Sequence, residues 1–323
     1  MEKGRSTLDH RRVLVTGGSG FVGRNLVPFL NESCSNVVAP THSDYDLLEQ
    51  NAVREMLADH KPEVVFHLAG LSGGIMANRR SPGDYCQQNL AINTCVMHEA
   101  WRAGVDKFIT LIGGCSYPAL APSPIKEDEL WNGYPQPDSA AYSLAKAMSV
   151  VMAQAYRAQH GFDAIVLVPG NLYGPFDNFD LQNAHIIPAT IRKFLEAKRD
   201  GLDEVVAWGT GTPVRDFIYV GDACEAIVLA AERYSGPEII NISSGVGITT
   251  RELVQTVAEL SGFAGRVTWD ASKPDGQMLK VFDVTRMREI LGYECRTSLR
   301  EGLKATTEWL ANNYATARLQ SDL

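Results

Sequence analysis

A glycine-rich turn at residues 17–23 constrains the fold of this chain more than any other part of the sequence. The turn follows the apolar run Val13–Val15 and precedes Phe21–Leu30, whose apolar residues recur with helical spacing. Backbone N–H groups at the start of such a helix lie at its positive end, where they can bind a pyrophosphate. Close packing of the strand against the helix is the alternative reason for glycines here. The candidate dinucleotide contacts are Gly17, Gly20, Phe21, Val22 and Gly23.

Short apolar runs alternate with longer helical patterns through the first two-thirds of the chain. The predicted strands are Val13–Val15, Asn36–Ala39, Val64–His67, Phe108–Leu111 and Ala164–Val168. The predicted helices between them include Phe21–Leu30, Ala52–Asp59, Ala91–Ala103 and Ala140–His160. This rhythm predicts an α/β fold, a doubly wound parallel sheet of Rossmann type with helices on both faces. Ligands of such sheets bind at the carboxyl ends of the strands.

The rhythm breaks after Gly170, where Asn, Asp, Pro and Gly become frequent. We therefore predict a dinucleotide-binding domain at residues 1–170, to which residues 216–243 return, and a smaller C-terminal substrate-binding lobe at residues 171–215 and 244–323. Within residues 216–243, the apolar runs Phe217–Val220 and Ile239–Ile242 are predicted to rejoin the parallel sheet. Further helices are predicted at Ile191–Ala197, at Asp222–Arg233, after Thr250 as N-cap, at Val284–Leu291 and at Leu299–Asn313.

Composition narrows the class of protein. The 323 residues carry a formal charge of −8 and no block of Lys or Arg, which argues against a nucleic-acid partner. The six cysteines are scattered without a C-x-x-C pair, so neither a disulfide framework nor a metal site is predicted. The N-terminus is polar and no stretch reaches membrane-spanning length, so we expect a cytoplasmic protein without a membrane partner.

Tyr142 and Lys146 lie four residues apart in the predicted helix at 140–160. This spacing puts both side chains on one face of the helix, about one turn apart. A nearby ammonium group favours the phenolate and is expected to lower the pKa of Tyr142. The tyrosine could then exchange a proton with a sugar carbonyl or hydroxyl. A solvated surface pair is the alternative meaning of the same spacing.

Further segments carry a resemblance that a glycine turn alone could not. They are Gly73–Asn78, Cys115–Pro118, Asn171–Phe179, His185–Pro188, Trp208–Arg215 and Asp270–Gly276. Together with the Tyr142/Lys146 pair, they resemble the extended short-chain dehydrogenase/reductase family, and within it the GDP-sugar epimerase/reductases that make GDP-L-fucose. The resemblance runs from about Arg12 to Asn313. It implies epimerisation at C3 and C5 and reduction at C4 of a GDP-4-keto-6-deoxy-mannose type sugar.

The resemblance also assigns roles to residues. Cys115 and His185 would be the base and acid of epimerisation, Tyr142 would protonate the reduced oxygen, and Lys146 would hold the nicotinamide ribose. Cofactor contacts would extend to Thr41, His42, Ser43, Ala69, Gly70, Asn171 and Leu172. The nucleotide sugar would meet Lys193, Trp208, Arg215, Asp275 and Lys280. Related enzymes are usually homodimers, so the resemblance also implies a homodimer, whose interface would involve residues 91–103 and 139–160.

The cofactor is predicted to be NADP, with NAD less favoured. An NAD enzyme of this type carries an acidic residue near the end of the second strand, which holds the ribose 2′-hydroxyl. Here that strand runs into Thr41, His42 and Ser43, and Asp44 comes late. Hydroxyls and an imidazole could instead accept a 2′-phosphate. The arginine that the family places inside the glycine turn is missing, since residues 18–20 read Gly-Ser-Gly.

One position departs from the family pattern. A Ser or Thr that would hydrogen-bond the substrate's keto oxygen is replaced by Gly113, and Ser116 would substitute only if the backbone turned it inward. A slower enzyme, an enzyme for a related sugar, or a residue changed to trap a state would each account for this. Three other functions also stay open: an epimerase, isomerase or dehydratase of nucleotide sugars that retains NAD, a single-carbon epimerase/reductase acting on a related GDP-keto sugar, and a catalytically silent nucleotide-binding regulator.

Overall fold

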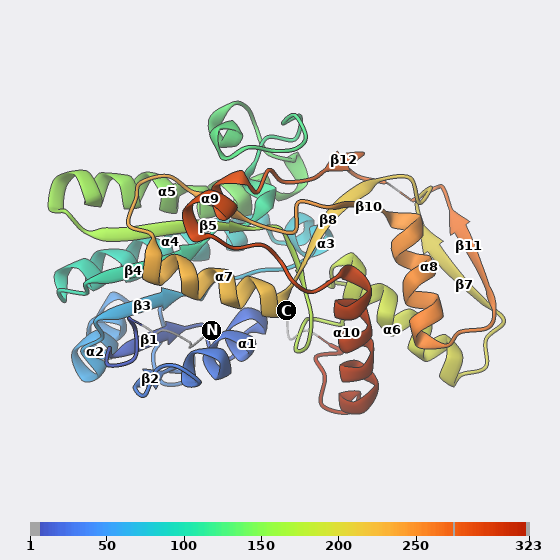
Figure 1. The fold of residues 1–323 in the computed structure, drawn as a ribbon, viewed down its shortest axis with the longest axis horizontal. Helices are drawn as coiled ribbons and strands as arrows, with labels where there is room; N and C mark the ends of the chain where they lie inside the picture. The colour runs from blue at the N-terminus through green and yellow to red at the C-terminus, as the bar shows by residue number, and fades with distance from the viewer. Residues whose placement is uncertain (1–6, 274, 321–323) are drawn as a thin grey trace.

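The first group of elements is built on a six-stranded sheet whose strands are all parallel. The computed structural model describes residues 7–273 and 275–320; Pro274, within the segment Asp270–Gly276, lies outside them. The strand order is β2-β1-β3-β4-β5-β9 (Figure 1). The strands are β1 (Val13–Thr16), β2 (Val37–Val38), β3 (Val64–His67), β4 (Lys107–Leu111), β5 (Asp163–Pro169) and β9 (Ile240–Ile242). The predicted α/β fold class is confirmed.

Helices cover both faces of this sheet because its strand residues alternate between two cores. Val13 and Val15 of β1 pack with α1 (Phe21–Asn31), α7 (Val220–Arg233) and α9 (Thr285–Leu291). Leu14 points the other way, into a core shared with three helices. These are α2 (Gln50–His60), α4 (Pro82–Arg102) and α5 (Ala140–His160). The short helix α3 (Ile75–Arg80) precedes α4.

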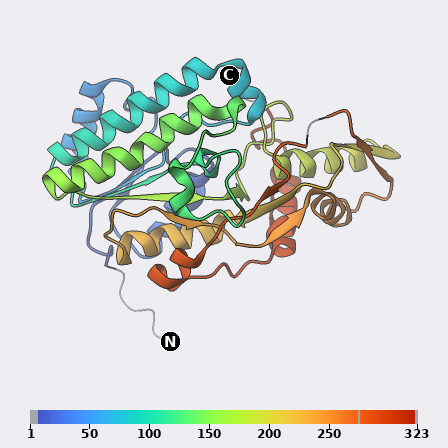
Figure 2. The ribbon, with the colours of Figure 1, turned by 90° about the horizontal axis from the view of Figure 1, so that it is seen from above.

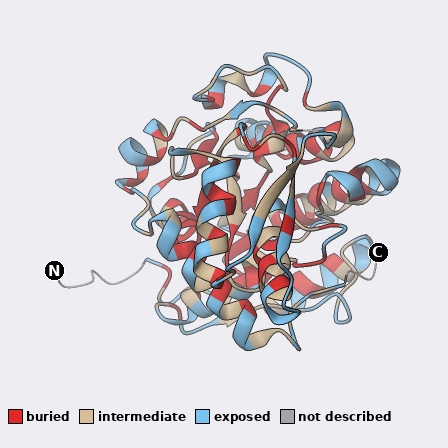
Figure 3. Ribbon diagram, turned by 90° about the vertical axis from the view of Figure 1, so that its right-hand side faces the viewer, coloured by how far each residue is buried: buried red, intermediate tan, exposed pale blue. Residues whose placement is uncertain are grey.

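A second group of elements forms its own core on the right of Figure 1. Strand β8 pairs with β6, β10 and β12, and β11 pairs with β7. The strands are β6 (Asn171–Tyr173), β7 (Glu204–Trp208), β8 (Val214–Tyr219), β10 (Gly247–Thr249), β11 (Arg266–Asp270) and β12 (Leu279–Lys280). The helices are α6 (Ile186–Arg199), α8 (Thr250–Ser261) and α10 (Leu299–Asn313). Figure 3 faces this group, and the outward sides of its helices are exposed while the inward sides are buried.

Three elements differ from the sequence predictions: one strand pairs with a different partner and two helices begin at different residues. The run at 217–220 does not rejoin the parallel sheet, because β9 takes the position beside β5 and β8 pairs with β6 instead. Helix α4 begins at Pro82, well before residue 91, with proline in its first turn. Thr249, rather than Thr250, caps α8 through a capping box with Glu252.

Some features are absent from residues 7–273 and 275–320. No helix there is both long and apolar enough to cross a membrane. No group of three His, Cys, Asp or Glu side chains in the same ranges could hold a metal ion. The six cysteines are free thiols.

Candidate active site

The predicted cofactor and catalytic segments meet at the carboxyl ends of the strands of the parallel sheet. Gly17 follows β1, Gly70 follows β3, Cys115 follows β4 and Asn171 follows β5. Since these strands are adjacent and parallel, their carboxyl ends lie side by side. The short helix η1 (Gly114–Ser116) carries Cys115 at these carboxyl ends. Asn171, at the start of β6, donates to the backbone oxygen of Asp216 at 2.7 Å.

The glycine turn forms a cradle that side chains would fill. Gly17 has a φ of +72°, and a Cβ there would lie 2.7 Å from the amide nitrogen of Ala69. A Cβ on Gly23 would lie 2.3 Å from the carbonyl oxygen of Gly17. Gly20 is the N-cap of α1 and brings no capping side chain to the first turn, which begins with Phe21 and Val22. This backbone fits the pyrophosphate of a dinucleotide at a helix N-terminus.

The turn after β2 is closed by its own hydrogen bonds. Asp44 Oδ2 accepts from the amide and the hydroxyl of Thr41, at 2.8 and 2.7 Å. The hydroxyls of Thr41 and Ser43 are 2.8 Å apart. These bonds lower the pKa of Asp44 and hold its carboxylate within the turn. The exposed imidazole of His42 is 3.9 Å from Asp46.

Tyr142 and Lys146 lie on α5 as predicted, but the expected effect on the tyrosine is wrong. Burial raises the pKa of Tyr142 above its ordinary value, with further contributions from the charges of Cys115 and Tyr85. Lys146 Nζ donates to Asn93 Oδ1 at 3.4 Å rather than to the phenol. Burial also lowers the pKa of Lys146 to about 8. Desolvation therefore outweighs the attraction expected from the helical spacing.

Cys115 lies close to both members of this pair. A negative charge on its thiol raises the pKa of Tyr142, Lys146 and Lys280. A Cβ on Gly113 would lie 2.9 Å from Cys115 Sγ and 3.8 Å from the Tyr142 oxygen. Position 113 therefore lies next to both the thiol and the phenol.

Ser116 does not replace the hydroxyl missing at position 113. It is buried, and its hydroxyl donates to the carbonyl oxygen of Ser143 at 3.0 Å. That bond ties η1 to the first turn of α5 and leaves the Ser116 proton engaged within the protein.

His185 is the N-cap of α6. The residue is exposed, and desolvation by the surrounding protein lowers the pKa of its imidazole, so the ring is neutral near pH 7. The loop before His185 is held by the segment that precedes α3, because the Gly74 amide donates to Asn183 O at 3.0 Å. Gly73, the residue before Gly74, lies close to the hydroxyl of Tyr85. The ring of Tyr85 packs edge-on against that of Tyr142, with 6.0 Å between the ring centroids. These contacts link the loop of His185 to the tyrosine.

In the second group of elements, Trp208 is 57% exposed at the end of β7. The ammonium of Lys193 lies 4.8 Å from its ring, and that of Lys273 lies 5.6 Å away. Sequence reasoning missed Lys273, although it stands in the Asp270–Gly276 segment. The sequence marks Lys273 only as a positively charged residue in a segment rich in turn-forming residues. Burial lowers the pKa of Lys193.

Asp275 and Arg215 connect the turn after Trp208 to the strands beside it. Asp275 accepts from the amide and the hydroxyl of Thr210, at 2.7 and 2.8 Å. Arg215 donates to the backbone oxygen of Asp275 at 3.1 Å. Lys280 is the register partner of Arg215 across β8 and β12 and lies 5.9 Å from the ring of Phe282. Phe282 in turn packs against Gly114, which brings β12 toward Cys115.

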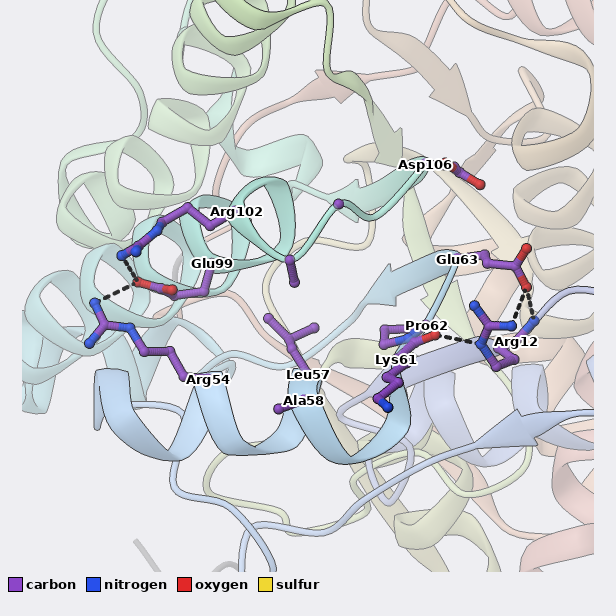
Figure 4. Close-up of a pocket in the computed structure, with 12 residues that line it drawn as sticks. Arg12, Arg54, Leu57, Ala58, Lys61, Pro62, Glu63, Glu99, Arg102 and Asp106 are labelled. Carbon is purple, nitrogen blue, oxygen red and sulfur yellow. Dashed lines mark hydrogen bonds and ion pairs between the residues drawn. The ribbon is translucent and has the colours of Figure 1, made fainter.

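A cavity of about 700 Å³ lies on the opposite side of the sheet, at the amino ends of its strands (Figure 4). Its lining includes Arg12, Glu63 and Asp106, which precede β1, β3 and β4. Arg54 and Arg102 both pair with Glu99, at 3.0 and 3.8 Å. Because this cavity lies at the amino ends of the strands, it is separate from the candidate active site, and its charged side chains pair with one another.

The fold and the site define an enzyme that binds a nicotinamide dinucleotide at a Rossmann-type sheet and carries a Tyr–Lys pair beside it. The chain belongs to the NAD dependent epimerase/dehydratase family, whose model matches residues 13–243.

Relatives and solved structures agree with this assignment. The chain is 43% identical to GDP-L-fucose synthase 1 of Arabidopsis thaliana over 303 residues, 94% of each protein. It is 38% identical to the GDP-L-fucose synthase of Escherichia coli K12, covering 95% of this chain and 98% of that protein. A GDP-L-fucose synthetase from Naegleria fowleri bound to NADP superposes with a TM-score of 0.89 at 26% identity, over 97% of this chain and 98% of that chain.

Proposed function

We propose that this chain is an NADPH-dependent epimerase/reductase that converts GDP-4-keto-6-deoxymannose to GDP-L-fucose. The observation that carries the proposal is the position of Cys115 against the Tyr142/Lys146 pair. A thiol placed there can remove protons from carbons next to the keto group that the tyrosine serves. Relatives at this level of identity are named GDP-L-fucose synthases.

In the reduction, the cofactor supplies a hydride and the protein supplies a proton. The cradle at Gly17 and Gly23 would hold the pyrophosphate, and Lys146 would reach the nicotinamide ribose. Tyr142 would give its proton to the C4 oxygen. Because burial raises the pKa of Tyr142, the phenol is protonated at neutral pH and suited to act as the acid.

In the epimerisation, Cys115 and His185 would work as a base and an acid. The thiolate would take the proton from C3 or C5, leaving an enolate whose charge lies on the C4 oxygen beside Tyr142. A proton from His185 would return to the opposite face of the ring. His185 must acquire that proton first, since its lowered pKa leaves it neutral at pH 7. We expect the epimerisation rate to fall at high pH for this reason.

The turn after β2 supports NADP over NAD. The Asp44 carboxylate is engaged by Thr41, so it is not presented to a ribose 2′-hydroxyl. The exposed imidazole of His42 is available to a 2′-phosphate. A His42→Ala variant should weaken NADPH binding more than NADH binding, and equal weakening would argue against this contact.

The second group of elements supports a role in holding the nucleotide sugar. Lys193 and Arg215 offer charge to a diphosphate, and the exposed indole of Trp208 offers a flat face to a nucleobase. The carboxylate of Asp275 is used within the protein, where it fixes the turn that follows Trp208. We propose residues 171–215 and 244–323 as the sugar-binding lobe on these grounds.

A homodimer joined through α4 and α5 is supported by exposed apolar side chains. Leu144, Met148 and Val151 follow one another along the outer face of α5 and are 38%, 44% and 43% exposed. Helices α4 and α5 lie side by side on the surface (Figure 2). Covering this stripe would remove it from water. A Met148→Glu variant should sediment as a monomer, whereas an unchanged dimer would place the interface elsewhere. We retain a cytoplasmic location as a prediction for cell fractionation.

The deciding experiment mixes the protein with GDP-4-keto-6-deoxymannose and NADPH in deuterated water. NADPH loss with deuterium at C3 and C5 would establish both half-reactions. Deuterium at one carbon would indicate a single-carbon epimerase/reductase. Tightly held NAD with no net oxidation would indicate the isomerase, and binding without turnover the silent regulator.

A further inference from the structure

A chain of buried polar side chains runs from β1 to the catalytic helix. Thr16 Oγ1 lies 2.8 Å from His67 Nδ1, and His67 Nε2 lies 3.1 Å from Asn93 Oδ1. Asn93 Oδ1 also accepts from Lys146 Nζ at 3.4 Å. Thr16, His67, Asn93 and Lys146 are 1%, 1%, 3% and 6% exposed. Each comes from a different element, so the chain links β1, β3, α4 and α5.

The direction of every hydrogen bond in this chain follows from its lysine end. The Lys146 ammonium can only donate, so Asn93 must present its oxygen to it. The same oxygen faces His67 Nε2, which must therefore carry the ring proton. His67 Nδ1 is then an acceptor, and the Thr16 hydroxyl donates to it. Burial lowers the pKa of His67 to about 3, which agrees with a neutral ring bearing one proton.

Among residues 7–273 and 275–320, only these two donors set the orientation of the Asn93 side-chain amide. Its nitrogen is buried and has no hydrogen-bond partner in the described part of the chain. If the amide turned over, its N–H groups would face the ammonium and the His67 N–H. Removing the His67 N–H would therefore remove one of the two groups that keep the oxygen toward Lys146.

The absence of a side chain at Gly70 leaves room for the Lys146 ammonium beside α4. A Cβ on this residue would lie 2.7 Å from Asn89 Oδ1 and 3.6 Å from Lys146 Nζ. Asn89 is itself fixed, since its amide nitrogen donates to Leu71 O at 3.0 Å and Tyr85 O at 2.7 Å. Lys146 thus lies between a bare backbone and the two asparagines of α4.

We infer that His67 and Asn93 are positioning residues, which hold the Lys146 ammonium charged and in place for Tyr142 and the cofactor ribose. Neither touches the reacting atoms. Without the Asn93 oxygen, the buried ammonium would lose its hydrogen-bonded acceptor, and its charged form would be less favoured. The inference rests on the proposed function for its kinetic test and is independent of it for the titration described next.

The direct test is a pH titration of the free, full-length protein labelled with ¹³C at lysine Cε, followed by NMR. A Lys146→Met variant assigns the resonance. Asn93→Asp, which adds a negative charge, should raise the titration midpoint of Lys146 by about one pH unit or more. Asn93→Leu and His67→Phe should lower it, and His67→Gln, which keeps a side-chain N–H, should restore it. The other titratable groups around Lys146 are Cys115 of η1 and Tyr142 of α5, with Tyr85 of α4 behind the tyrosine, and all variants retain them.

A kinetic readout separates positioning from a merely structural effect. The pH dependence of hydride transfer should move with the Lys146 midpoint. A one-unit drop from a midpoint of about 8 lowers the charged fraction at pH 8 from about one half to about one eleventh, so Asn93→Leu should slow transfer about fivefold at that pH. Asn241→Leu is the matched control, because Asn241 is equally buried and hydrogen-bonded but lies away from Lys146. It should lower the melting temperature and leave the pH profile unchanged.

Several outcomes would overturn the inference. A Lys146 midpoint and pH profile that stay at wild-type values in Asn93→Leu and His67→Phe would show that the chain is only structural. If those variants do not fold, unchanged midpoints in Asn93→Asp would lead to the same conclusion. A wild-type protein without turnover would refute the proposed function, while the titration would still decide this inference.

Discussion

Gly113→Ser restores a hydroxyl at the position where the site departs from its family, and the structure sets its expected effect. The backbone at Gly113 has φ −85° and ψ 147°, which any residue adopts, so serine at this position should not strain the backbone dihedral angles. The new Cβ would lie 3.8 Å from the Tyr142 oxygen, and its hydroxyl extends one bond further. That hydroxyl can reach the C4 oxygen that Tyr142 protonates.

The magnitude comes from two opposing effects. A hydrogen bond to an oxygen that gains charge stabilises the transition state by about 1.5–3 kcal/mol, equivalent to roughly 10- to 100-fold in rate. The same Cβ would lie 2.9 Å from Cys115 Sγ, so the thiol must move. A misplacement of about 1 Å can cost a reaction about 100-fold. We therefore expect faster hydride transfer and slower proton exchange.

The assay follows both half-reactions of one sample in deuterated water, NADPH loss by absorbance and deuterium at C3 and C5 by NMR. Gly113→Ala is the matched control, since it adds the same Cβ and displaces the same thiol without a hydroxyl. Serine should exceed alanine in hydride transfer by 10- to 100-fold on the estimate above. Equal hydride-transfer rates in the two variants would refute the reasoning, and slower transfer in both would indicate a substrate that fills this space.

Three further predictions concern single residues. Cys115→Ser should slow deuterium exchange by about 100-fold or more while hydride transfer falls less, and an equal loss of both would remove Cys115 from the base role. Tyr142→Phe should abolish NADPH oxidation and largely retain exchange; normal oxidation would remove Tyr142 from the acid role. His67 has a pKa of about 3 in the folded protein, so the unfolded chain binds its proton first as pH falls below the ordinary value of 6.5, and stability rises with pH across this window. Between pH 7.5 and 5 this lowers the free energy of unfolding by about 2 kcal/mol, so in urea unfolding the loss of stability over this range should be smaller by about that amount in His67→Gln than in the wild type.

The features that could be predicted from sequence are those set by local requirements. The turn at residues 17–23 needs glycine at positions that a Cβ would fill, and the spacing of Tyr142 and Lys146 is fixed by the helix. The parallel sheet covered by helices on both faces follows from the βαβ rhythm of the first two-thirds of the chain.

The features that were missed depend on burial and on contacts far apart in the chain. The direction of the Tyr142 pKa shift is set by desolvation, which no spacing reveals. The bond from His67 to Asn93 joins two elements, and an isolated His or Asn carries no pattern. The partner of β8 was missed because two apolar runs, at residues 217–220 and 239–242, competed for the place beside β5.

The crossing of the chain between its two groups of strands has a consequence for synthesis. Ile240 of β9 pairs with Leu167 of β5, after the chain has already built β6, β7 and β8. The first sheet therefore cannot be completed on the ribosome until β6, α6, β7 and β8 of the second group have emerged. Until then the edge of β5 stays open to wrong partners. A fragment that ends near residue 170 would keep that open edge permanently, so we expect it to aggregate when expressed alone.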